Sequence, residues 1–167
     1  DVYKRQLVPC DISDPAQARS LVERVASELD GLDILVNNAA YQRYYENFED
    51  ITLDDWKRTF DTNVHAVFNL TRLCVPHLRG GGAIINTASL EAYVPAPDRL
   101  DYAATKAAIN NLSKGLAQQL ASRGIRVNVV APGPTWSALQ VSQGVSDEQM
   151  EQFDDESTYQ RAGQPAE

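Results

Sequence analysis

A serine, a tyrosine and a lysine lie close together near the middle of this chain. Tyr102 and Lys106 are four positions apart, which places the phenol and the ammonium group on one face of a helix, one turn from each other. Because a nearby positive charge favours the phenolate, we expect the pKa of Tyr102 to fall below its usual value of ~10, so that the group exchanges protons near neutral pH. Ser89 follows a short apolar run, residues 83–88, which predicts a buried parallel strand. Since open α/β sheets bind ligands at strand ends, this hydroxyl is placed to hold a carbonyl oxygen beside Tyr102.

A Tyr-x-x-x-Lys pair alone is weak evidence, because both residues are ordinary on helix surfaces. Its sequence context is more specific. Residues 32–40 read as a buried strand running into two asparagines, Asn63 lies midway along a predicted long helix, and residues 125–134 read as a strand ending in Pro-Gly-Pro. With these segments the sequence resembles the classical short-chain dehydrogenase/reductase family, whose ordered motifs Asn-Asn-Ala-Gly, Asn, Ser, Tyr-x-x-x-Lys and Pro-Gly all have counterparts here. The resemblance covers nearly the whole chain, from about Leu7 to Glu167.

The resemblance implies an NAD(P)-dependent oxidoreductase that moves a hydride between nicotinamide and a secondary alcohol or ketone. In that family Tyr102 would be the acid/base, and Ser89 would orient the substrate oxygen. Lys106 would tune the phenol and bind the nicotinamide ribose. Asn63 would hold a water in a proton relay through Lys106. The competing interpretation of Asn63 is a helix-interior asparagine that bonds locally to backbone.

The resemblance also implies contacts with NAD or NADP, and the choice between them depends on residues that precede this sequence. Asp11 would accept from the exocyclic amine of adenine beside Ile12, although aspartate before a helix start is also common as a cap or turn residue. Val64 would pack near the adenine or simply belong to the core. The other implied contacts follow two strand ends: Asn38, Ala39, Pro132, Gly133, Thr135 and Ser137. No metal ligand set is expected.

Several positions depart from the family pattern. Ala40 replaces the usual glycine, so the turn there must accept a Cβ. Thr135 and Ser137 stand where an aliphatic residue and a threonine are usual, and Ser137 retains a hydroxyl. Trp136 between them would either line the substrate pocket or anchor a lid. The Gly-rich phosphate loop of the family has no counterpart in this sequence.

These departures suggest the middle of a longer protein. We interpret residues 1–6 as an adapter-derived scar, which leaves residues 7–167 as a partial NAD(P)-binding Rossmann domain with the catalytic centre and the start of a substrate lid. Residues 163–167 resemble a helix opening. Three alternatives remain open at this point: an inactive fragment, a cofactor-binding regulator, and an epimerase or dehydratase of the same superfamily.

Composition narrows the function class. The chain has 167 residues, 43% of them hydrophobic, which is enough for one domain and its core. A net charge of -8 argues against a nucleic-acid surface, and no apolar run approaches the ~18 residues of a membrane span. Cys10 and Cys74 are far apart without a CxxC motif, so we expect neither a metal site nor a disulfide, and a cytoplasmic location.

Predicted strands alternate with predicted helices along the chain. The strands begin at Leu7, with residues 7–10, and continue with the three named above. The helices run from Asp14 to Gly31, from Thr52 to Pro76 with glycines 80–82 beyond its end, and from Tyr102 to near Gly124. This alternation predicts an incomplete Rossmann-like, doubly wound parallel sheet in three α/β/α layers. The resemblance implies that the second and third helices pair between subunits, giving a homodimer or homotetramer.

Overall fold

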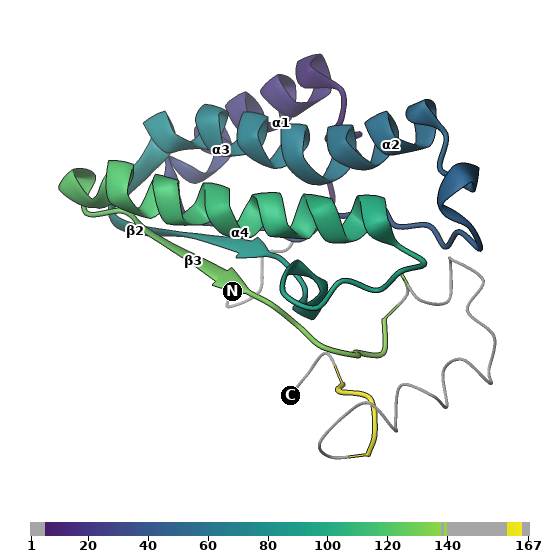
Figure 1. Cartoon of the computed structure of the whole chain (residues 1–167). Helices are drawn as coiled ribbons and strands as arrows, with labels where there is room; N and C mark the ends of the chain where they lie inside the picture. Colours follow the sequence, from purple (N-terminus) through teal and green to yellow (C-terminus); the bar gives the residue numbers. More distant parts are fainter. Residues whose placement is uncertain (1–5, 138, 140–159, 165–167) are drawn as a thin grey trace.

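The computed structural model describes residues 6–137, 139 and 160–164, and Figure 1 shows the path of the chain. Its helices and strands, in chain order, are α1 (Pro15–Leu29), β1 (Leu32–Asn37), α2 (Leu53–Phe60), α3 (Ala66–Cys74), β2 (Leu78–Thr87), α4 (Leu100–Leu120) and β3 (Arg126–Val130). A π-helical turn, Asp61–His65, joins α2 to α3. Short 3-10 turns lie at Phe48–Asp50, Val75–His77, Leu90–Ala92 and Ala121–Arg123.

The three strands form one parallel sheet in the order β1-β2-β3. Figure 1 shows the four helices on one face of this sheet, where α3 packs on β1 and β2, and α4 packs on β2 and β3. A parallel sheet connected by helices confirms the predicted Rossmann-like α/β arrangement, and one of the two expected helix layers lies within the described residues. All three strands therefore end at the same edge, which is where the predicted site residues follow.

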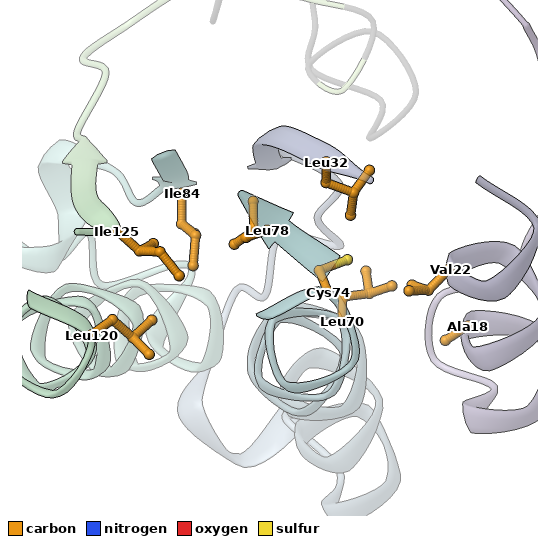
Figure 2. Packing of buried hydrophobic residues seen from close by; sticks show 9 residues of the cluster. All are labelled: Ala18, Val22, Leu32, Leu70, Cys74, Leu78, Ile84, Leu120 and Ile125. Carbon is orange, nitrogen blue, oxygen red and sulfur yellow. The ribbon is translucent and has the colours of Figure 1, made fainter. Parts of the chain in front are cut away.

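A hydrophobic cluster packs α1, α3 and α4 against the sheet. Ile84 of β2 is completely buried in this cluster, and Cys74 of α3 packs there as a small apolar residue. Figure 2 shows how the buried side chains of the cluster meet: Ala18, Val22, Leu32, Leu70, Cys74, Leu78, Ile84, Leu120 and Ile125. No helix within the described residues is long and apolar enough to cross a membrane.

Two predicted boundaries are wrong. Residues 7–10 form no strand, and Leu7 is 96% exposed, because a strand needs a neighbour to pair with and no described strand lies beside this segment. Glycines 80–82 lie inside β2, which begins at Leu78. At Gly82 the backbone of β2 lies close to the backbone of β1, because a Cβ on Gly82 would be only 3.0 Å from the carbonyl oxygen of Asp33. The start of this strand therefore favours glycine.

Candidate active site

Ser89, Tyr102 and Lys106 meet just beyond the carboxyl end of β2. Ser89 lies two residues after the strand and caps the short turn Leu90–Ala92, while Tyr102 and Lys106 lie in the first two turns of α4. The hydroxyl of Ser89 lies beside the Tyr102 phenol and lowers its pKa. The Lys106 Nζ atom donates to the Thr87 carbonyl oxygen at 2.7 Å and lies 5.3 Å from the centroid of the Tyr102 ring. The spacing of the three residues in sequence therefore becomes one cluster in space.

Burial controls the ionisation of the phenol and the ammonium group. Tyr102 is 7% exposed, and loss of water around it raises its pKa to about 12, although the hydrogen bond with Ser89 lowers it. Lys106 is 3% exposed, and burial lowers its pKa from 10.5 to about 8. The expected fall in the phenol pKa is therefore not found, because desolvation outweighs the favourable contacts.

Asn63 lies at the centre of the π-helical turn and is 2% exposed. Its Nδ2 atom donates to the Tyr41 carbonyl oxygen at 2.8 Å and to Thr105 Oγ1 at 3.1 Å, and its Oδ1 atom accepts from the Tyr41 N–H at 2.7 Å. These partners are 22 and 42 positions away, so the interpretation as a locally bonded asparagine is wrong. The amide braces the loop after β1 against α4, and π-turns of this kind often occur at functional sites.

A chain of buried amides lies beneath the site. Asn37 Nδ2 donates to Asn86 Oδ1 at 2.8 Å and to Thr71 Oγ1 at 3.2 Å, and Asn86 Nδ2 donates to Ser113 Oγ at 2.8 Å. Asn37 thus joins the end of β1 to side chains of α3 and β2. The role of Asn86 was missed, although its amide in the apolar run 83–88 was a visible signal, since a buried amide needs partners.

A second buried contact holds the start of α4. Asp101 is completely buried, its Oδ1 atom accepts from the Tyr102 N–H at 2.8 Å, and its Oδ2 atom accepts from Thr59 Oγ1 on α2 at 2.6 Å. Arg99, at the cap position, makes no side-chain capping bond, so Asp101 supplies the acceptor that the first turn needs. The sequence analysis missed Thr59 and Asp101. The only signal for this contact was an acidic residue in the first turn of a predicted helix.

We expect Thr59→Val to destabilise the fold by about 1–3 kcal/mol, because it leaves a buried carboxyl oxygen without its hydrogen-bond partner. Urea unfolding monitored by circular dichroism measures this loss. The matched control is Thr62→Val, which makes the same exchange at a half-buried position one turn further on. Equal stability of the two variants would show that the Thr59 contact with Asp101 does not hold α4.

Several residues expected to contact the cofactor lie beside two hollows. Ile12, Asn38 and Ala39 line an apolar cavity of about 300 Å³, and Asp11 lines a polar one of about 440 Å³ with Ala40. The Asp11 Oδ1 atom accepts from the backbone N–H of Ser13 at 2.9 Å and from its hydroxyl at 2.7 Å, and this lowers the pKa of the carboxyl. Asp11 therefore makes the turn contact that was the competing interpretation, with its side chain exposed.

The remaining expected contacts follow β1 and β3. Asn38 accepts from Thr87 Oγ1 at 3.0 Å, which ties the end of β1 to the end of β2. Thr135 Oγ1 donates to the Gly133 carbonyl oxygen at 3.1 Å. Among the other expected cofactor contacts, the half-buried ones are Val64 and Pro132. The exposed ones are Ala39, Gly133 and Ser137. Trp136 is exposed too.

Some predicted segments lie outside the described residues. They are most of the lid, at residues 138 and 140–159, residues 1–5 of the suspected scar, and residues 165–167 of the predicted helix opening. Gly163, the first residue of that predicted opening, pairs with Thr135 in an isolated bridge.

Comparison with known proteins identifies the family. The whole chain, residues 1–167, matches the family model described as Enoyl-(Acyl carrier protein) reductase. The chain is 49% identical over 164 residues to the uncharacterized oxidoreductase YghA of Escherichia coli, covering 98% of this chain and 56% of that protein. It is 41% identical over 160 residues to the glucose and ribitol dehydrogenase of Daucus carota, covering 96% of this chain and 55% of that protein. The chain thus spans only about 56% of the length of such relatives.

A solved structure shows the same arrangement of the backbone. A short chain dehydrogenase from Burkholderia cenocepacia, in complex with NADP, superimposes with a TM-score of 0.85 at 38% sequence identity. The match covers 94% of this chain and 63% of that one. Together with the match to the family model over the whole length, this similarity shows that the chain belongs to the short-chain dehydrogenase/reductase family.

Proposed function

We propose that this chain carries the catalytic centre of an NAD(P)-dependent oxidoreductase that transfers a hydride between nicotinamide and a secondary alcohol or ketone. One observation carries the proposal most directly. A buried phenol, whose pKa the neighbouring Ser89 hydroxyl lowers and whose ring has the Lys106 ammonium group beside it, lies where the parallel strands end. Ligands bind at this edge in open α/β sheets.

The donor set around Lys106 fits a nicotinamide cofactor. An ammonium group has three N–H donors, and within the described residues one of them binds the Thr87 carbonyl oxygen. The remaining two are available for the paired hydroxyls of a ribose. The exposed backbone at Asn38 and Gly133 lies after the neighbouring strands and would approach the same cofactor. These residues would hold the cofactor, and Lys106 and Tyr102 would both contact it.

The positions of the side chains support the reduction of a ketone. The hydroxyls of Ser89 and Tyr102 would bind the carbonyl oxygen and orient it. The reduced nicotinamide, when bound, supplies the hydride to the carbonyl carbon. With its pKa raised to about 12, Tyr102 is protonated at neutral pH and holds the proton that the alkoxide oxygen then takes. Lys106, with a pKa of about 8, remains mostly charged at pH 7 and stabilises the phenolate left behind.

Replacement of that proton requires a path from water. Both N–H groups of the Asn63 side chain are already bound to Tyr41 and Thr105, so they cannot also hold a relay water. We propose that an oxygen of Asn63 acts instead, either its backbone carbonyl or the remaining lone pair of Oδ1. Proton transfer would then run from such a water to Lys106 and on to Tyr102.

The proposal is tested by following the absorbance of reduced nicotinamide with the longest natural protein that contains this sequence. NADH and NADPH are each tried against a panel of ketones, sugars and quinones, because the sequence leaves both cofactor and substrate open. We expect turnover with at least one combination. Tight cofactor binding without turnover of any substrate would overturn the proposal and favour a regulatory role.

We also propose that the complete protein works in the cytoplasm as a homodimer or homotetramer, with helices α2, α3 and α4 at the interface. Exposed apolar side chains on this surface support the idea, since Leu53 is 68% exposed and Phe68 is 51% exposed.

Phe68→Glu should therefore shift the oligomer to monomers, because a charge cannot be buried at an apolar interface without a partner. Size-exclusion chromatography with light scattering measures the change in mass. Phe48→Glu serves as the control, since Phe48 is 70% exposed on the separate turn Phe48–Asp50. An unchanged mass for the Phe68 variant would rule out this interface.

A further inference from the structure

A pair of opposite charges lies half-buried beside the candidate active site. Arg99 Nη1 lies 3.3 Å from Glu91 Oε1, and the two side chains are only 13% and 14% exposed. The guanidinium also bonds Asp98 Oδ1 at 3.1 Å and Tyr44 Oη at 2.9 Å, with its carbon 4.7 Å from the centroid of the Tyr44 ring. Charged side chains are seldom buried to this extent without a reason in packing or function.

Both members of the pair are attached to the catalytic residues. The backbone N–H of Glu91 donates to Ser89 Oγ at 3.1 Å, which fixes Glu91 in the turn beside Ser89. Arg99 occupies the cap position of α4, three residues before Tyr102, and its carbonyl oxygen accepts from the Ala103 N–H at 2.9 Å. A cation at a helix N-terminus is opposed by the helix dipole, so the carboxylates of Glu91 and Asp98 must stabilise Arg99 there.

We propose that the charge pair of Glu91 and Arg99 sets the electrostatic environment of the Tyr102 phenol, so that removing either charge moves the working pH range of the reaction, in opposite directions. This inference rests on the proposed function, since it assigns the pair to the acid/base step of that reaction. The two residues are positioning residues, because they act through Tyr102.

The charges of Glu91 and Arg99 shift the pKa of the Tyr102 phenol in opposite directions. Burial is the largest influence on the pKa of Tyr102 and raises it, and the hydrogen bond from Ser89 lowers it. Among the neighbouring ionisable groups, Glu91 and Tyr44 raise this pKa, whereas Arg99 lowers it. Glu91 also raises the pKa of Lys106, the other titratable group at the ring. Loss of the Glu91 charge thus lowers the pKa of both Tyr102 and Lys106. The direction of the change is the same whichever of the two groups a pH profile reports.

The test is the pH dependence of kcat/KM in the longest natural protein that contains this sequence. We expect Glu91→Gln to move the profile to lower pH and Arg99→Met to move it to higher pH, each by about half a pH unit or more. The double variant should return towards the wild-type profile, because both charges are then removed together. Arg99→Lys retains the charge and should leave the profile close to that of the wild type.

Matched controls come from the exposed pair of Arg24 and Glu28 on α1, whose atoms lie 2.8 Å apart. Arg24→Met and Glu28→Gln change the net charge by the same amounts, and we expect no shift from either. Folded Glu91 and Arg99 variants with unshifted profiles, or with shifts of the same sign, would overturn the inference while leaving the proposed function intact.

A second measurement does not depend on turnover. In protein labelled with carbon-13 at the tyrosine rings, NMR reports the fraction of Tyr102 ionised at a fixed alkaline pH, and Tyr102→Phe assigns the signal. Glu91→Gln should increase this fraction and Arg99→Met should decrease it. Equal fractions in the three proteins would contradict the inference even if no substrate has been found.

Discussion

Replacing Tyr102 with phenylalanine should abolish turnover, with a loss of about a thousandfold or more, because general acid catalysis by a positioned side chain contributes factors of this size. The substitution removes only the hydroxyl that would give its proton to the substrate oxygen. The ring that packs beside Lys106 remains, so the fold and the site for the cofactor should be retained. Steady-state rates of nicotinamide oxidation measure the first effect, and fluorescence titration with reduced cofactor measures the second.

Tyr93→Phe is the matched control for this substitution. Tyr93 follows the turn after Ser89, and it is 60% exposed, so its hydroxyl can be deleted without touching the cluster. We expect near wild-type turnover from that variant. If Tyr102→Phe turned over at the same rate as Tyr93→Phe, the phenol of Tyr102 would not be the proton donor.

Replacing Lys106 with methionine should abolish turnover and at the same time stabilise the fold near neutral pH. Burial lowers the pKa of Lys106 from 10.5 to about 8, a cost of roughly 3 kcal/mol below that range, since each unit is worth about 1.4 kcal/mol. Loss of the hydrogen bond to the Thr87 carbonyl oxygen offsets about 1 kcal/mol of the gain. We therefore expect a net stabilisation of about 1–2 kcal/mol at pH 7.

The same lysine gives the fold a distinctive pH dependence. Between pH 8 and 10.5 the unfolded chain binds more protons at Lys106 than the folded chain does, so this contribution to stability rises with pH across that window. Urea unfolding at pH 7 and pH 9.5 should show that the wild type gains stability relative to Lys106→Met as the pH rises.

Lys114→Met, at an exposed position of the same helix, is the control and should keep the wild-type gain. A Lys106→Met variant that is less stable than the wild type at pH 7 would show that the buried ammonium group stabilises this fold.

Much of the architecture could be predicted because it depends on local patterns. Short apolar runs ending in polar residues identified β1, β2 and β3, and Asp14 with Pro15 identified the start of α1. The segment at residues 7–10 has the same apolar pattern and forms no strand. Formation of a strand depends on a neighbouring strand as much as on its own residues. A local sequence pattern does not show whether such a neighbour is present.

The residues that position the site were harder to predict than the residues in it. A spacing of four brings Tyr102 and Lys106 together directly. The contact between Thr59 and Asp101, and the pair of Glu91 and Arg99, join segments that meet only through the tertiary fold. The predicted fall in the pKa of the Tyr102 phenol was wrong for a related reason. Burial has the largest effect on this pKa, and burial is a property of the whole structure.

The π-turn around Asn63 was also invisible in sequence. Residues 52–76 have the apolar spacing of one long helix, whereas the structure inserts the turn Asp61–His65 between α2 and α3. Its cause lies outside the helix, because the amide of Asn63 binds the backbone of Tyr41 in the loop after β1. Contacts of this kind bend a helix without changing the spacing of its apolar residues.

The central claim, that this chain carries a centre for hydride transfer, is tested most directly by following an isotope. The longest natural protein that contains this sequence is incubated with a ketone or sugar substrate and with NADPH or NADH that carries deuterium at C4 of the nicotinamide. Mass spectrometry and NMR of the alcohol product should find deuterium on the carbinol carbon with the wild type, and no product with Tyr102→Phe. Product that forms without deuterium from either face of the labelled cofactor would contradict the claim.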